Sequence, residues 1–260
     1  MPNFAANISM MFNEVGFLDR FEAASKAGFR AVEFLFPYEH PKEKLVEALK
    51  RNGLELALHN MVPGDWSKGE RGIACHPDRT KEFEANLPKA IEYATALKAP
   101  QVNCLAGIAP QGAAPEKLRE TFVRNLRYAA PRLKDAGVRL VTEPINNRDI
   151  PGFYLNTSAQ AESILDEVDS DNLFIQYDVY HMQIMEGDLA PTFERLLPKI
   201  RHVQIADTPG RHEPGTGEIN YDFLFRHFDR VGYQGWIGCE YKPAAGTVDG
   251  LGWFEPFKKR

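Results

Sequence analysis

The sequence has few cysteines, no long hydrophobic run and no excess of positive charge. Three widely spaced cysteines, Cys75, Cys104 and Cys239, occur in 260 residues. An odd, scattered set is a poor basis for a disulfide framework, so we expect free thiols and a cytoplasmic location. No apolar run approaches the about 20 residues that cross a bilayer, so we expect no membrane span. The first residues lack a basic stretch followed by an apolar one, which predicts no secretory signal.

The balance of charge argues against one class of partner. The chain has 31 Lys and Arg against 36 Asp and Glu, a formal net charge of −5. Proteins that bind nucleic acid through its phosphates favour a basic face, so we expect no general affinity for nucleic acid. Hydrophobic residues make up 43% of the chain, and no low-complexity tract interrupts them. This composition is typical of a globular protein.

Short apolar runs alternate with longer amphipathic ones, which is the pattern of repeated βα units. The predicted strands are Phe4–Ser9, Ala31–Leu35, Leu54–His59, Gln101–Leu105, Val138–Glu143, Leu173–Asp178, His202–Ala206 and Trp236–Glu240. The predicted helices lie near 16–27, 41–52, 80–98, 115–136, 157–168, 187–198 and 221–231. Eight strands in a chain of this length predict one (β/α)₈ barrel, a TIM barrel, over residues 1–260. No G-x-G-x-x-G follows the first strand, so a dinucleotide site has no support.

The connection between the third and fourth predicted strands is longer than the others. Its excess, residues 61–80, is rich in glycine, proline and charge. A loop of this length in a compact fold is often a lid or a binding loop. We therefore predict that 61–80 covers the site, with a plain surface loop as the alternative.

Three acids stand at the ends of predicted strands, where the active site of such a barrel is assembled. They are Glu143, Asp178 and Glu240. Unpaired acids are costly to bury and would repel one another at one barrel mouth. A divalent cation removes both problems, and Gln204 on the intervening strand can add a neutral oxygen. An all-oxygen set favours Mg²⁺ or Mn²⁺ over zinc. The alternative is a solvated acidic rim or a set of internal salt bridges.

Other polar residues of the strands are less specific. His59 ends the third predicted strand and is a candidate substrate contact. His202 precedes Gln204 by two residues and so shares its inward face, either as a hydrogen-bond partner of the site or as core filling. Glu33 could also point inward, but nothing else in the sequence distinguishes it. The remaining histidines that we considered, His40, His76 and His227, are interpreted as surface or helix residues.

Longer motifs resemble a known superfamily from end to end. They include Asp178-x-x-His181, the segment GRHEPGTGEINY at 210–221, and the segment GYQGWIGCEYKP at 232–243. These stretches resemble the xylose-isomerase-like barrels, and within them hydroxypyruvate isomerases and 2-oxo-tetronate isomerases. Related sugar epimerases carry histidine where this chain has Gln204, which weakens the transfer of their ketose substrates.

The resemblance implies an isomerase that converts hydroxypyruvate to tartronate semialdehyde through an ene-diolate. It implies a metal held by Glu143, Asp178, Gln204 and Glu240, with both glutamates moving protons. By position, Asp149, His181 and Arg211 match residues that contact the substrate.

The alternatives are isomerisation of a four-carbon 2-oxo acid, 3-epimerisation of a ketose, and DNA cleavage. The superfamily's endonucleases need a histidine-rich zinc site, for which the strand ends supply too few histidines. A homo-oligomer is possible.

A carboxylate substrate also requires a cation. Lys242 follows Glu240 by two residues, so strand alternation predicts that both side chains point inward. Arg211 is the alternative cation. A different interpretation of Lys242 is that it neutralises the acidic cluster.

Overall fold

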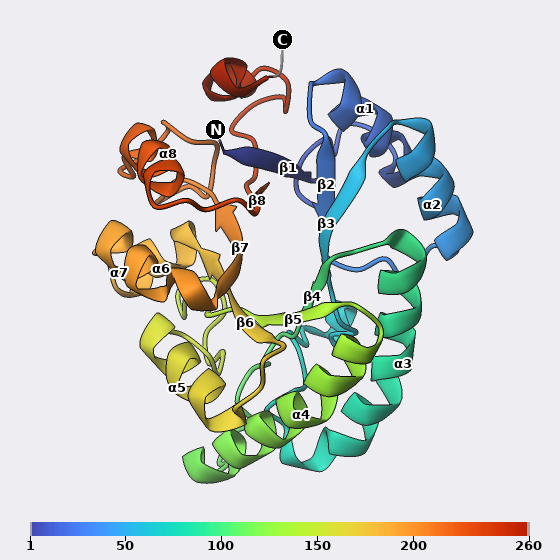
Figure 1. The fold of residues 1–260 in the computed structure, drawn as a ribbon, viewed down its shortest axis with the longest axis vertical. Helices are drawn as coiled ribbons and strands as arrows, with labels where there is room; N and C mark the ends of the chain where they lie inside the picture. Colours follow the sequence, from blue (N-terminus) through green and yellow to red (C-terminus); the bar gives the residue numbers. More distant parts are fainter. Residues whose placement is uncertain (1, 259–260) are drawn as a thin grey trace.

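Eight parallel strands close into a barrel in the computed structural model, which describes residues 2–258 (Figure 1). Each strand pairs with the next along the chain, and the last strand pairs with the first. The strands are β1 (Asn3–Asn7), β2 (Ala31–Phe34), β3 (Glu55–Asn60), β4 (Gln101–Asn103), β5 (Arg139–Thr142), β6 (Leu173–Asp178), β7 (Ile200–Ile205) and β8 (Trp236–Cys239). The predicted TIM barrel is confirmed, and every predicted strand overlaps an observed one.

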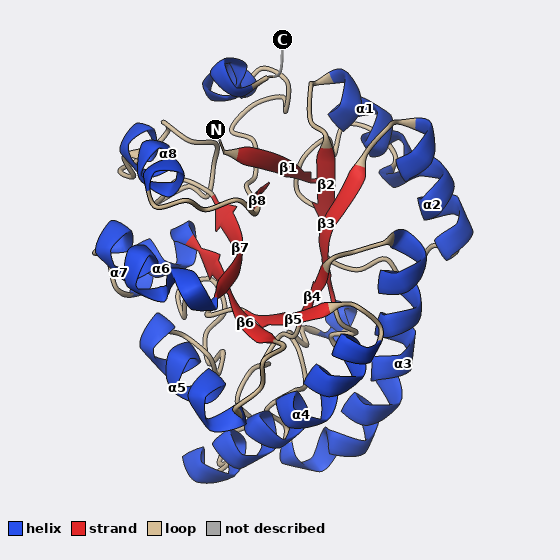
Figure 2. Ribbon diagram, viewed as in Figure 1, coloured by secondary structure: helices blue, strands red, loops and turns tan. Residues whose placement is uncertain are grey.

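Helices form a ring outside the strands (Figure 2). They are α1 (Arg20–Lys26), α2 (Lys42–Arg51), α3 (Thr80–Leu97), α4 (Pro115–Asp135), α5 (Ser158–Val168), α6 (Val179–Met185), α7 (Leu189–Leu196) and α8 (Tyr221–Arg230). One element that was not predicted from the sequence is α6, which begins directly after β6 because the Asp178 carboxylate caps it. Another is η5 (Leu251–Phe257), a 3₁₀ helix that follows β8.

The outside of the barrel is apolar, and its packing explains the position of η5. The Phe4 ring on β1 makes edge contacts with Trp253, Phe254 and Phe257 of η5 at 5.1–5.9 Å between ring centroids. It also meets Phe225 of α8 at 5.0 Å. The C-terminal segment therefore covers the face of β1, as the ribbon at the top of Figure 1 shows.

The inside of the barrel is polar and hydrogen-bonded. Glu33 on β2 is fully buried, with one carboxylate oxygen 2.6 Å from His202 Nε2 of β7. Its other oxygen accepts from Asn7 Nδ2 at 3.0 Å and from Gln204 Nε2 at 2.7 Å. Because β2 and β7 are not neighbours, these bonds cross the interior. They give His202 the role of a hydrogen-bond partner in this network rather than of simple core filling.

The segment 61–80 is fastened to the barrel rather than extended into solvent. It contains two 3₁₀ turns, η2 (Trp66–Lys68) and η3 (Pro77–Arg79). Gly72 forms an antiparallel bridge with Ala106, just beyond β4. Gly72 has φ +106°, and a Cβ atom there would lie 2.4 Å from the Leu105 carbonyl oxygen. This close approach requires glycine.

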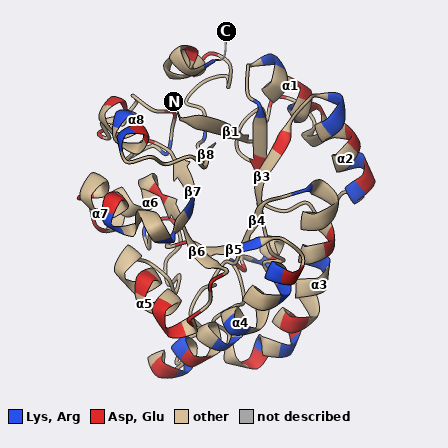
Figure 3. Cartoon of the chain, viewed as in Figure 1, with Lys and Arg blue, Asp and Glu red and all other residues tan. Residues whose placement is uncertain are grey.

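The surface and the thiols agree with the composition. Lysine, arginine and acidic residues are interspersed over the outer helices in Figure 3. All three cysteines are buried and free, as predicted. Among the helices of residues 2–258, none combines the length and the apolar character that crossing a membrane requires. Of the histidines interpreted as surface or helix residues, His227 lies on α8 but is buried, with Nε2 3.1 Å from the Ala190 carbonyl oxygen.

Candidate active site

Three buried acids meet at the carboxyl ends of the strands. Asp178 is the last residue of β6, and Glu143 and Glu240 directly follow β5 and β8. Their exposed fractions are 4% for Glu143, 1% for Asp178 and 8% for Glu240. Glu143 and Glu240 line a cavity of about 490 Å³. The structure therefore brings together the three acids that the sequence singled out.

The hydrogen bonds of these acids leave oxygen atoms available. Asp178 Oδ1 accepts from the backbone N–H groups of Tyr180 and His181, at 2.8 and 3.4 Å. Asp178 Oδ2 is buried and has no hydrogen-bond partner in the described chain. Glu143 accepts from Asn103 Nδ2 at 2.9 Å through Oε2. A buried carboxylate oxygen without a hydrogen-bond donor is costly, so an added cation beside Asp178 Oδ2 would be favourable.

Electrostatics in the cluster favour an added positive charge. Burial raises the pKa of Glu143 well above its usual range, and the carboxylates of Glu240 and Asp178 raise it further. Burial also raises the pKa of Asp178 to about 6 and that of Glu240 to about 8. A bound cation would oppose these shifts by stabilising the ionised carboxylates.

Among the described residues, the group at metal-ligand spacing includes two of the predicted acid ligands, Glu143 and Asp178, and not Glu240. Glu143, Asp178 and His181 each place one possible ligand atom within 4.8 Å of the others. The orientation of His181 makes it a hydrogen-bond donor in this group. Asn146 Oδ1 accepts from the backbone N–H of Asp149 at 2.7 Å, so its NH₂ group faces His181 Nδ1 at 2.6 Å. The neutral ring then carries its proton on Nε2, which points between Asp178 and Glu143 at 3.5 and 3.8 Å.

Gln204 lies beside the cluster but turns its nitrogen toward it. Its Nε2 donates to Glu33 and to Glu240 Oε2, and its Oε1 accepts from Gln176 Nε2 at 2.5 Å. The predicted use of the Gln204 oxygen as a ligand therefore requires the amide to rotate.

Arg211 is the cation held against the acids. Its Nη2 lies 2.8 Å from Glu240 Oε1 and 4.0 Å from Asp178 Oδ2, and its Nη1 lies 3.6 Å from Asp149 Oδ2. Burial works against this charge, but the carboxylates of Glu240, Asp178 and Asp149 outweigh it and raise the pKa of Arg211. Asp149, one of the predicted substrate contacts, is therefore close to the cluster.

The loop that carries Arg211 is organised by one carboxylate. Asp207 accepts four backbone hydrogen bonds, from Thr208, Gly215, Gly217 and Ile219, at 2.9–3.1 Å. A Cβ atom at Gly217 would lie 2.0 Å from the Thr208 carbonyl oxygen, so the two ends of the loop are in close contact. The segment 210–221, one of the motifs that resemble the xylose-isomerase-like barrels, is thus a loop folded around Asp207.

Two other predicted substrate contacts lie differently from expectation. β8 ends at Cys239, so strand alternation does not position Lys242, and that argument is wrong. Lys242 is instead an exposed loop residue that still lines the cavity, and its backbone N–H donates to the Arg211 carbonyl. His59 is fully buried and is not part of the cavity wall. Burial lowers the pKa of His59 to about 4, so it is neutral at pH 7.

Several residues of the site were not found by sequence reasoning. Asn103 and Asn146 orient Glu143 and His181, as described above. Trp66 and Arg71 of the segment 61–80 line the cavity. For the two asparagines, the available signal was a polar residue inside or just after a predicted strand. For Trp66 and Arg71, it was the unusual length of their loop.

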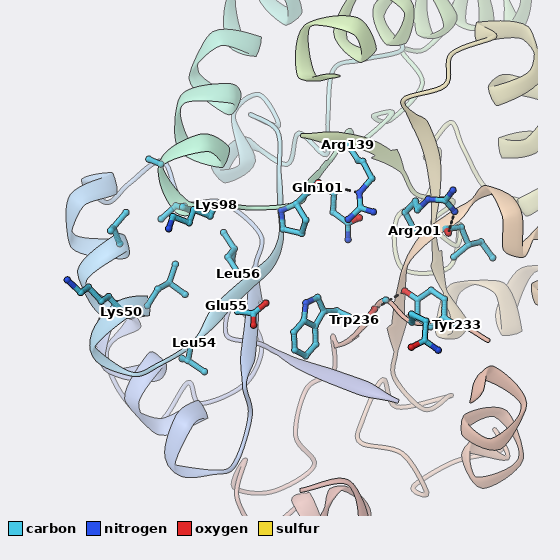
Figure 4. A pocket seen from close by; sticks show the side chains of 18 of the residues that line it. Lys50, Leu54, Glu55, Leu56, Lys98, Gln101, Arg139, Arg201, Tyr233 and Trp236 are labelled. Carbon is cyan, nitrogen blue, oxygen red and sulfur yellow. Dashed lines mark hydrogen bonds between the residues drawn. The ribbon is translucent and has the colours of Figure 1, made fainter. Parts of the chain in front are cut away.

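A larger cavity, of about 1000 Å³, lies at the opposite end of the barrel (Figure 4). Residues at the amino ends of the strands line it, among them Glu55, Gln101, Arg139, Arg201 and Trp236. It contains one carboxylate, that of Glu55, which is exposed. The volume of a cavity therefore does not indicate the active site here, since the buried acids are at the other mouth of the barrel.

The protein is a closed barrel of eight parallel strands with buried acids at its carboxyl mouth, where the active site of such barrels is assembled. Residues 21–257 match the family described as xylose isomerase-like TIM barrel, and the chain belongs to this family.

The relatives are similar over their whole length. The chain is 52% identical to hydroxypyruvate isomerase of Escherichia coli over 258 residues, which cover 99% of this chain and 100% of that one. It is 50% identical to 2-oxo-tetronate isomerase of Cupriavidus necator over 260 residues, all of both chains. A crystal structure described as AP endonuclease, family 2, from Brucella melitensis has a TM-score of 0.98 and 45% identity, and covers both chains fully. The chain is therefore an enzyme, an isomerase.

Proposed function

We propose that the enzyme interconverts hydroxypyruvate and tartronate semialdehyde with the help of Mg²⁺ or Mn²⁺. The observation that carries this proposal is the buried triad of Glu143, Asp178 and Glu240, in which Asp178 Oδ2 accepts no hydrogen bond from the described residues. The E. coli relative named hydroxypyruvate isomerase supports the choice of substrate. The buried free thiols support a reducing compartment such as the cytoplasm.

Glu143, Asp178 and Glu240 would hold the cation, with Gln204 as a fourth ligand after rotation of its amide. When bound, the cation polarises the substrate carbonyl and stabilises the negative charge that develops on its oxygen. The oxygen-only set of these four side chains favours Mg²⁺ or Mn²⁺.

The reaction moves one proton between carbons and one between oxygens. A carboxylate takes a proton from C3 of hydroxypyruvate, and the C–H electron pair forms the double bond of an ene-diolate. A carboxylic acid returns a proton to C2, while the C3 hydroxyl loses its proton and the C2 oxygen gains one. We assign the two carbon-proton transfers to Glu143 and Glu240, which come from strands three apart and can flank the substrate.

His181 acts as a donor to a substrate oxygen. Its Nε2–H is fixed by the bond between Nδ1 and Asn146 and points between Glu143 and Asp178. Burial lowers its pKa well below the usual range, and the neighbouring Arg211 charge lowers it further. A neutral imidazole donates one defined hydrogen bond without adding charge. Arg211 and Asp149 complete this wall of the cavity.

Isomerisation of 2-oxo-tetronate is the second candidate, and the 50% identical relative of that name favours it. The cavity of about 490 Å³ has room for the additional carbon. A substrate panel separates the candidates. With Mg²⁺ or Mn²⁺ present, NMR would follow hydroxypyruvate, 2-oxo-tetronate and fructose. Turnover of hydroxypyruvate at the highest kcat/KM supports the proposal, preference for the C4 acid supports the second candidate, and turnover of fructose alone would exclude both.

A further inference from the structure

Arg71 is a cation in the cavity wall that has no acidic partner among residues 2–258. The wall contains three cations, Arg71, Arg211 and Lys242. Arg211 is engaged by the carboxylates of Glu240 and Asp149. Arg71 forms no ion pair within residues 2–258. The acid next to it, Glu70, is bound instead to Arg79 and to the backbone N–H of Asp65, both at 2.5 Å.

The guanidinium of Arg71 is held with one edge unused. Its Cζ lies 4.0 Å from the centroid of the Trp66 ring, a stacked cation–π contact. Nη1 donates to the carbonyl oxygens of Trp66 and Glu70, at 3.2 and 2.8 Å. Nε and Nη2 have no hydrogen-bond partner in the described part of the chain. The Nε–Nη2 edge is a pair of parallel donors that matches the two oxygens of a carboxylate.

The backbone at Arg71 is fixed as well. The next residue, Gly72, donates its N–H to the Pro63 carbonyl at 2.9 Å and bridges to Ala106. The preceding residue, Glu70, is held by its contacts with Arg79 and with the backbone N–H of Asp65. A cation fixed before binding loses little conformational entropy when the ligand arrives. Lys242, by contrast, is an exposed loop residue whose long side chain must be ordered.

We propose that Arg71 binds the substrate carboxylate through its Nε–Nη2 edge and thereby selects 2-oxo acids over neutral ketoses. This inference rests on the proposed function, because it concerns the substrate of the same cavity. It assigns a purpose to the segment 61–80: η2 supplies the Trp66 platform, and the Gly72 bridge fixes the position of the arginine. Lys242 then adds a second, solvated positive charge on the wall.

The test compares an acid with its neutral counterpart. Dihydroxyacetone differs from hydroxypyruvate in having a hydroxymethyl group in place of the carboxylate. Arg71→Met should raise the KM for hydroxypyruvate about 10- to 100-fold, the range expected for hydrogen bonds to a charged group. The inhibition constant of dihydroxyacetone and the affinity for Mn²⁺ should stay within about 3-fold. Arg71→Lys should raise KM less than Arg71→Met, because it keeps the charge but loses the paired donors.

Lys68→Met is the matched control on the same loop. Lys68 is exposed, pairs with Asp65 and does not line the cavity. The KM of Lys68→Met for hydroxypyruvate should therefore equal that of the wild type. An unchanged KM for hydroxypyruvate in both Arg71 variants would overturn the inference. Turnover of hydroxypyruvate by the wild type would still support the proposed function in that case. Equal losses for hydroxypyruvate and dihydroxyacetone would also overturn it, because that result indicates a general disturbance of the loop. Absence of hydroxypyruvate turnover in the wild type would refute the proposed function itself.

Discussion

At the scale of single residues, Glu143 and Glu240 differ in their surroundings although both are buried. Glu143 has one bond, from Asn103, whereas Glu240 is held by Arg211, Asn7 and Gln204. Burial raises the pKa of both, so each can hold a proton more readily than an exposed glutamate. Two carboxyl groups that each hold a proton more readily than usual suit reversible transfer between adjacent carbons.

Glu143→Gln and Glu240→Gln should each lower kcat by at least about 100-fold, the scale of general acid–base catalysis. An amide cannot accept the proton, but it keeps one oxygen that can bind a cation. The affinity for Mn²⁺ should therefore fall less than kcat does. Steady-state rates and calorimetric titration of the same preparations measure both quantities. Near-normal kcat in either variant would remove that glutamate from the proton-transfer step.

Lys242→Met should raise the KM for hydroxypyruvate with little change in the affinity for Mn²⁺. The reason is that Lys242 lines the cavity as an exposed cation that makes no ion pair in the described structure. The effect should be smaller than that of Arg71→Met, because water screens an exposed charge. If KM stays constant while Mn²⁺ binding weakens, Lys242 is a counter-charge of the acid cluster.

At the scale of elements, buried carboxylates shape two segments at the carboxyl mouth of the barrel. Asp207 collects four backbone N–H groups and so folds the loop that presents Arg211. Asp178 caps α6 and thereby places His181 one turn into that helix. The same carboxylate therefore shapes the backbone through Oδ1 and faces the site through Oδ2.

Asp207→Asn should destabilise the protein by about 3 kcal/mol, because the amide nitrogen faces two backbone donors and leaves them unpaired. Loosening the loop should also lower kcat/KM through Arg211. Urea unfolding and steady-state kinetics measure the two effects. Asp135→Asn, at the exposed end of α4, is the control and should change neither. Stability equal to that of the control would show that Asp207 does not organise the loop.

The strands and their ends were predictable from the sequence because the spacing of apolar residues and the turn residues are local signals. Every strand was found, and Glu143, Asp178 and Glu240 were found because each acid stands at a strand end. Glu33 was passed over because its partners, His202 and Gln204, are about 170 residues away in the sequence. The direction of the Gln204 amide also depends on contacts across the barrel, which no local pattern encodes.

At the scale of the whole molecule, the two ends of the barrel are chemically different. The carboxyl mouth gathers the buried acids, and the amino mouth contains the larger cavity with Arg139 and Arg201 (Figure 4). The polar network around Glu33 lies inside the barrel and connects β1, β2 and β7 beneath the site. This network supports Glu240 through Asn7 and Gln204, each of which donates to both Glu33 and Glu240.

The most direct measurement is the turnover of hydroxypyruvate by enzyme treated with a chelator, before and after Mg²⁺ or Mn²⁺ is added back. We expect at least about a 100-fold loss after treatment and full recovery with either ion, because the ion would stabilise the developing oxyanion. Asp178→Asn should require a higher Mn²⁺ concentration for half-maximal recovery. Full activity in excess chelator, or recovery in Asp178→Asn at the wild-type Mn²⁺ concentration, would contradict the proposed dependence on a cation held by Asp178.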